Sequence, residues 1–129
     1  MNKYKENNET ETTKFQITLT MSSEYTAGKT TIKFAGIGTI SIDWGDGAQC
    51  EMHTISDDCP EITHNYSEII NESIITISGE NITELDCCSK YQFTEIDVSK
   101  NPRLTKLNCS SNMLKKLNTS DNTALKWLD

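Results

Sequence analysis

The chain carries one four-residue unit five times, as ITEL (82–85), FTEI (93–96), LTKL (104–107), LKKL (114–117) and LKWL (125–128). Each unit opens and closes on an apolar residue, and the units follow one another at nearly equal steps. Two steps give a period of about 21 or 22 residues, which lies in the range of proteins built from stacked repeats. This period predicts coils that stack their apolar interiors on one another.

Asparagine and cysteine recur at fixed offsets behind these units. Asn101, Asn112 and Asn122 each close a short polar run. Because an amide can bond main-chain groups that a turn leaves unpaired, we expect the three side chains to form internal ladders. Cys87 and Cys109 are one full period apart and are predicted to stack inside the coil as small apolar residues. Cys88 should then point outward.

The residues between the inward-pointing ones are predicted to form outward columns from coil to coil. One column is Glu84, Lys106 and Trp127, and its neighbour contains Asp86 and Asn108. Trp127 is a candidate anchor for a protein or a glycan, because exposed aromatic side chains often carry binding energy. The alternative is that Trp127 only covers the open end of the stack.

Residues 15–80 show a different pattern, in which apolar residues alternate with polar ones. Examples are the runs at 15–21, 32–34 and 40–44. A period of two is typical of half-buried strands. Glycine-containing turns separate these runs at close spacing, which predicts a β-sandwich or barrel.

Charge divides the chain at the same places. Residues 1–14 hold three Lys and three Glu with almost no apolar residue and are predicted to be a flexible arm. Residues 15–80 hold 2 basic and 10 acidic groups, a balance of −8, whereas residues 81–129 hold 7 and 6, a balance of +1. We therefore expect an arm (1–14), a sandwich (15–80) and a repeat segment (81–129).

The overall composition argues against binding to nucleic acid, against a transmembrane helix and against an export signal at residues 1–14. The formal net charge of −7 and the pI of about 4.8 argue against binding to a nucleic-acid backbone, which requires clustered Lys and Arg. No apolar run approaches the roughly 20 residues of a transmembrane helix. Residues 1–14 contain no apolar stretch of the kind an export signal needs.

No motif in the sequence places catalytic groups together, and we expect neither enzyme activity nor a cofactor. Asp43 and Asp46 suit a hard cation, but a tight turn in which they bond local N–H groups explains them better, so no metal is expected. The spacing of His53 and His64 matches no zinc-ligand motif. Two readings stay open for Cys50 and Cys59, a disulfide or free thiols.

Two segments resemble known families. The runs IDVSKN (96–101) and LNCSSN (107–112) fit the pattern Leu-x-x-Leu-x-Cys-Ser-x-Asn and resemble the cysteine-containing leucine-rich repeats of internalin-type and BspA-like bacterial surface proteins. The segment ISIDWGDG (40–47), with HNY (64–66), is similar to the Gly-Asp-Gly and His-x-Tyr signatures of PKD-type β-sandwich domains. The extra residue and missing Asn after ITEL are as expected of a terminal repeat.

The resemblance implies a PKD/Ig-like β-sandwich followed by a short leucine-rich-repeat solenoid of about two turns, in a bacterial surface or secreted protein. The function it implies is non-catalytic protein or glycan binding of the adhesion type. The alternative is a structural stalk or scaffold with no ligand of its own. Because the repeats stop in mid-coil, we expect the chain to be a piece of a longer protein, and its open repeat end offers a surface for self-association.

Overall fold

The computed structural model describes residues 15–23, 28–66, 73–88 and 92–129. All regular secondary structure in these ranges is β-strand, which confirms the predicted mainly β class. The arm predicted at residues 1–14 lies outside the described residues. The strands are β1 (Gln16–Met21), β2 (Lys29–Gly36), β3 (Gly38–Asp43), β4 (Glu51–Ile55), β5 (Glu61–Asn65), β6 (Ile74–Ser78), β7 (Ile82–Asp86), β8 (Phe93–Asp97), β9 (Lys106–Asn108) and β10 (Trp127–Leu128).

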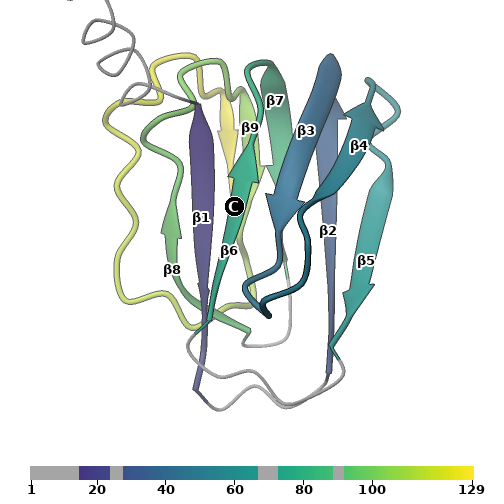
Figure 1. Cartoon of the computed structure of the whole chain (residues 1–129). Helices are drawn as coiled ribbons and strands as arrows, with labels where there is room; N and C mark the ends of the chain where they lie inside the picture. Colours follow the sequence, from purple (N-terminus) through teal and green to yellow (C-terminus); the bar gives the residue numbers. More distant parts are fainter. Residues whose placement is uncertain (1–14, 24–27, 67–72, 89–91) are drawn as a thin grey trace, which may run out of the picture.

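These strands form two five-stranded sheets that enclose one core (Figure 1). The first sheet has the order β4-β3-β6-β1-β8, and all of its pairs are antiparallel. The second sheet has the order β10-β9-β7-β2-β5. In the second sheet β2 pairs antiparallel with β5 and β7, whereas β7, β9 and β10 run parallel.

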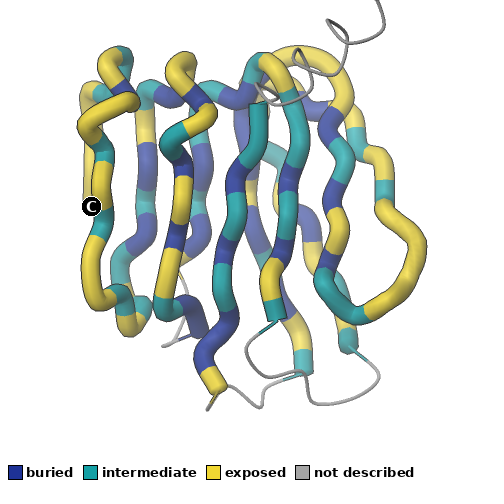
Figure 2. Tube along the Cα trace, turned by 60° about the vertical axis from the view of Figure 1, so that its left-hand side comes forward, coloured by how far each residue is buried: buried dark blue, intermediate teal, exposed yellow. Residues whose placement is uncertain are grey.

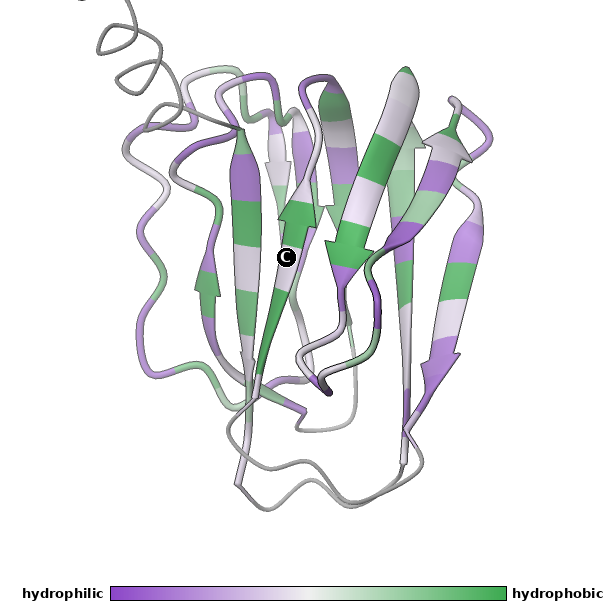
Figure 3. Ribbon diagram, viewed as in Figure 1, coloured by the Kyte–Doolittle hydropathy of each residue, from purple (hydrophilic) through white to green (hydrophobic). Residues whose placement is uncertain are grey.

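The alternating residues of the first half of the chain place their apolar side chains in this core. Along β1, Ile17, Leu19 and Met21 are buried, and the polar residues between them are half-buried. Figure 2 shows buried residues alternating with half-buried or exposed ones along the strands. Along β3, Ile40 and Ile42 are buried and Ser41 between them is half-buried, and the matching alternation of hydropathy is visible in Figure 3. The predicted period-two strands at 15–21, 32–34 and 40–44 therefore correspond to β1, β2 and β3.

The repeated units alternate between the two sheets. The unit at 82–85 lies in β7, the unit at 93–96 lies in β8 of the other sheet, and the unit at 104–107 returns to β9 beside β7. The parallel register joins Glu84 to Lys106 and Lys106 to Trp127, each a step of one repeat period. The unit at 114–117 is not a strand, but its two leucines pack against the core.

Both sheets run without a break across the boundary predicted at residues 80–81. β8 extends the first sheet beside β1, and β7 extends the second beside β2. At the point of crossing, Gly36 has φ +154°, and a Cβ atom there would collide with the main-chain oxygen of Asn81. Ile37 donates its N–H to that same oxygen at 3.2 Å. Only glycine permits this close approach of the two segments.

No helix in the described ranges is long and apolar enough to cross a membrane.

Candidate binding groove on the second sheet

The outer face of the second sheet carries the columns that the repeat predicts. Glu84, Lys106 and Trp127 lie side by side on β7, β9 and β10 because these strands pair in parallel register. Asp86 and Asn108 form the neighbouring column two positions further along the strands. Since side chains alternate along a strand, all five point away from the core.

Trp127 lies on the edge strand β10, and its indole ring contacts the side chain of Lys106. The Lys106 ammonium lies 5.2 Å from the centre of the indole ring, within the range of a cation–π contact. The Trp127 residue is nevertheless 43% exposed. Part of the indole is therefore available to a ligand.

All five predicted binding residues line a single groove with a volume of about 430 Å³. This is within the range of roughly 300–1,000 Å³ that is usual for small-molecule sites. The sequence did not indicate the rest of the lining, which comes mainly from β2 and from the loop between β4 and β5. These further residues are Lys33, Asp58, Cys59 and Leu85.

The loop that borders the groove is tied to β2 by main-chain hydrogen bonds. Gly36 donates its N–H to the Ser56 carbonyl at 3.2 Å, and Phe34 donates to the Pro60 carbonyl at 3.3 Å. Between these anchors Cys59 adopts a left-handed conformation with φ 55°. One side of the groove is therefore formed by a loop whose main chain is hydrogen-bonded to β2 on both sides of Cys59.

The thiol of Cys59 is not activated in this setting. Burial raises its pKa, the charges of Glu84 and Asp86 raise it further, and Lys33 and Lys106 only partly oppose them. Because the thiolate is the nucleophile, a raised pKa keeps this side chain in its unreactive form at neutral pH.

The side chains of the three repeated asparagines bond main-chain groups that are distant in sequence. Asn122 donates to the carbonyls of Val98 and Asn101 at 2.8 and 3.1 Å, and Asn101 donates to that of Gln16 at 3.0 Å. Asn112 donates to the Cys87 carbonyl at 3.0 Å and accepts the Phe93 N–H at 3.0 Å. Asn112 and Asn122 thus connect parts of the repeat segment to one another, and Asn101 connects this segment to β1.

The cysteines of the repeat divide into buried and exposed thiols. Cys87 and Cys109 are 0% and 7% exposed, and burial raises the pKa of both. Cys88 is exposed and accepts a hydrogen bond from the Ser110 hydroxyl at 3.3 Å. The buried pair fills space in the core, as its spacing of one period predicts.

The disulfide considered for Cys50 and Cys59 is not formed, and both are free thiols. Cys50 lies directly before β4, and Cys59 lies in the turn beyond the other end of that strand. A strand rises about 3.3 Å per residue. The length of β4 therefore keeps the two Cα atoms beyond the limit of about 7 Å for a disulfide.

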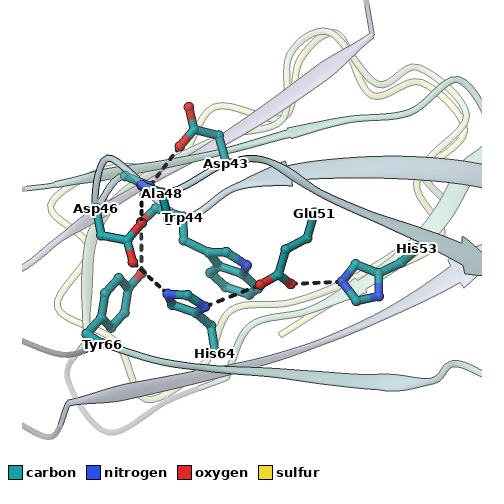
Figure 4. Close-up of polar contacts among 9 residues, drawn as sticks. Asp43, Trp44, Asp46, Ala48, Glu51, His53, His64 and Tyr66 are labelled. Atoms are coloured by element: carbon teal, nitrogen blue, oxygen red, sulfur yellow. Dashed lines mark hydrogen bonds and ion pairs between the residues drawn. The ribbon is translucent and has the colours of Figure 1, made fainter.

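A second group of polar and aromatic residues joins the two sheets at the end of β5 (Figure 4). The His64 ring stacks on Trp44 at 4.7 Å between centroids and meets Tyr66 edge-on at 4.6 Å. His64 donates from Nε2 to Asp46 at 2.8 Å, and the Tyr66 hydroxyl donates to the Trp44 carbonyl at 2.9 Å. We call Trp44, Asp46, His64 and Tyr66 the His64 cluster.

The aspartates of this region serve the turn between β3 and β4. Asp43 accepts the Gly45 N–H at 2.9 Å, and Asp46 accepts the Ala48 N–H at 3.1 Å. These are the local N–H bonds that the sequence predicts. No three His, Cys, Asp or Glu side chains gather in the described residues in a way that could hold a metal ion.

The carboxylates around His64 are electrostatically stabilised. Burial raises the pKa of Asp46, but the hydrogen bonds from His64 and Ala48 and the charge of His64 outweigh it, so the pKa is lowered. Glu51 bonds His53 at 3.0 Å and lies 3.6 Å from His64 Nδ1. The hydrogen bond from His53 lowers the pKa of Glu51. These contacts connect β4, β5 and the turn that follows β3.

Comparison with protein-family models, with curated proteins and with solved structures finds no match to this chain.

Proposed function

We propose that this chain is a non-catalytic binding module of a bacterial surface or secreted protein, with the outer face of the second sheet as its recognition surface. The observation that carries the proposal is the convergence of Glu84, Asp86, Lys106, Asn108 and Trp127 in one groove. These residues come from three strands that are distant in sequence. The ligand is a protein or a glycan, and the interaction is of the adhesion type.

The leucine-rich-repeat part of the proposal is supported by the strand pairing. β7, β9 and β10 run parallel, and each step between them equals one repeat period. The intervening unit at 93–96 lies in the opposite sheet. This is the arrangement expected when each repeat is one coil stacked on the next. The amide of Asn122 joins its coil to Asn101, which holds the same offset in an earlier unit.

The PKD-like part is supported by the contacts of its two signatures. Gly45-Asp46-Gly47 follows Trp44, and His64 bonds Asp46 while it stacks on Trp44. We propose that residues 15–80 form a PKD-like sandwich that supports the repeats. Against catalysis, the one thiol in the groove, Cys59, has a raised pKa.

Binding assays with groove variants test this function. Trp127→Ala and Lys106→Ala should weaken capture of a ligand found by screening purified host surface proteins and a glycan array, because both side chains face the groove. Loss of an interface anchor typically costs about 2 kcal/mol or more. Lys116→Ala is the matched control, because Lys116 holds the same place in LKKL as Lys106 in LTKL but lies in another groove.

Thermal unfolding of each variant separates binding from stability. Both groove residues are on the surface, so the melting temperatures should stay close to that of the wild type. Full retention of binding by Trp127→Ala and Lys106→Ala would overturn the assignment of this face. A screen with no ligand at all, on a protein with a wild-type melting curve, would instead favour the structural stalk.

A further inference from the structure

The charges in the groove alternate in sign from strand to strand. Lys106 of β9 lies in register with Glu84 of β7, and Lys33 of β2 lies in register with Asp86 of β7. With Asp58 at the rim, the lining holds two cations and three anions. Such a mixture creates little net field to attract a strongly charged ligand. It does place donors and acceptors on strands about 4.8 Å apart.

The lining of the groove is more polar than apolar. Leu85 is only 1% exposed, and Trp127 is the one lining residue that shows a large apolar surface. The centre of a protein–protein interface is usually depleted of charge and rich in apolar contacts. Most residues that line this groove are charged or polar and only one is aromatic, which is the reverse composition.

A neutral sugar chain matches these features. Its hydroxyl groups can donate to Glu84 and Asp86 and accept from Lys106 and from the Asn108 amide N–H groups. The Asn108 oxygen already accepts the N–H and the hydroxyl of Ser110. The C–H face of a sugar ring suits the exposed part of the Trp127 indole, which is apolar and rigid. Because the tryptophan side chain has only two rotatable bonds, little side-chain freedom is lost on binding.

We propose that the groove binds a neutral oligosaccharide, with Trp127 as the stacking platform and Glu84, Asp86 and Asn108 as hydroxyl ligands. This assignment rests on the proposed binding function and names its ligand class. Lys106 acts mainly as a positioning residue for the indole, in addition to donating to a hydroxyl group.

The test measures binding of neutral and charged oligosaccharides to the whole chain. The neutral probes are linear oligomers of glucose, mannose, xylose and galactose, and the charged probes are oligogalacturonate and heparin fragments. Trp127 fluorescence reports binding, because the other tryptophan, Trp44, is buried. At least one neutral probe should bind, with affinity that changes less than about twofold between low and high salt.

Paired variants locate the site. Trp127→Ala should lower the affinity about tenfold or more, and Trp127→Phe should retain part of it because a ring remains. These two are followed by calorimetry, since each lacks the reporter ring. Glu84→Gln should weaken binding several-fold. Glu95→Gln, at the same place in FTEI as Glu84 in ITEL but lining the other groove, should leave it unchanged.

The outcomes separate the ligand class from the function. Binding of charged probes alone with steep salt dependence, or neutral binding that ignores Trp127 and Glu84, overturns the proposal. If a purified protein binds in a Trp127-dependent way while every neutral probe fails, the ligand class is wrong and the binding function stands. If nothing binds the folded chain, both are wrong.

Discussion

His64 is the residue through which the turn of the first sheet is fixed to the edge of the second. It lies near the end of β5, yet its ring bonds Asp46 of the β3–β4 turn and stacks on Trp44, which directly follows β3. Its side chain is 13% exposed and that of Asp46 is 16% exposed, so water screens the pair only partly. The strength of this link therefore depends on the charge of Asp46.

The lowered pKa of Asp46 makes the stability of the fold sensitive to acid. In the unfolded chain an aspartate titrates at about 3.9. Because the folded pKa is lower, the unfolded state binds more protons between the two values, and stability falls as the pH drops through this window. Asp46→Asn should lower the free energy of unfolding near pH 6 and make it decrease less between about pH 5 and pH 3.

Urea unfolding at a series of pH values measures this effect. Asp57→Asn removes an exposed aspartate from the β4–β5 loop and serves as the control, which should keep the wild-type acid dependence. An Asp46→Asn curve parallel to that of the wild type would show that the pair with His64 contributes nothing to acid sensitivity.

At the scale of the strands, the sequence predicts which side chains of a strand face the core better than it predicts which strands are neighbours in a sheet. The period of two places Ile17 and Leu19 inside, and the longer repeat identifies Lys106 and Trp127 as outward neighbours because repeats stack in order. Neither pattern shows that β2 lies beside β7, which brings Lys33 opposite Asp86 from a distant part of the sequence. The alternation of apolar and polar residues along a strand determines which side of the sheet a residue faces, but it does not determine which strand lies beside it.

The residues at the rim of the groove could not be predicted from the sequence for a related reason. Cys59 lies at the rim because the main-chain carbonyls of Ser56 and Pro60 accept hydrogen bonds from β2. Hydrogen bonds between main-chain groups do not depend on the side chains, so the sequence pattern does not reveal them. The same lack of register information left the pairing of Cys50 and Cys59 open. By contrast, the Asp46 turn depends on local bonds, which can be predicted from adjacent residues.

The stacking of the repeat elements depends on buried amides. Asn122 is 4% exposed, and its side chain donates to the carbonyls of Val98 and Asn101. Asn122→Ala leaves both carbonyls without this donor and should lower the free energy of unfolding by about 1–3 kcal/mol. Chemical denaturation monitored by circular dichroism measures the loss.

Asn118→Ala provides the matched comparison from the same stretch of the repeat segment. Asn118 is exposed and accepts the local Ser120 N–H at 2.9 Å, so its loss should cost about 0.5 kcal/mol or less. Equal effects of the two substitutions would mean that the hydrogen bonds from Asn122 to Val98 and Asn101 add nothing to stability beyond that of an exposed local bond.

At the scale of the whole molecule, the predicted sandwich and the repeats share one core. Ile17 and Leu19 of β1 belong to the same buried cluster as Leu104 and Leu107 of the repeat segment. Each sheet also contains strands from both sides of residue 80. β1 and β2 each have a strand of the repeat segment as a hydrogen-bonded neighbour, so the two halves share both sheets and the core.

This shared core predicts a single cooperative unfolding transition. Leu107→Ala removes a fully buried side chain from the repeat segment and should lower the free energy of unfolding by about 2–5 kcal/mol. In a Trp127→Phe background the fluorescence comes from Trp44, which lies in the other half of the chain. Its transition should shift by the same amount as the circular dichroism of the whole chain, since coincident probes mark a two-state transition.

Leu128→Ala is the control for this experiment, because Leu128 is 48% exposed and its truncation should cost much less. If Leu107→Ala instead leaves the Trp44 transition in place while circular dichroism shows an earlier step, the repeats unfold alone and the boundary at residues 80–81 is a thermodynamic one. If the fluorescence and circular dichroism transitions shift together, residues 15–80 and 81–129 unfold as one unit, and the groove depends on the stability of both. The rigidity of Trp127 would then depend on strands as distant as β1.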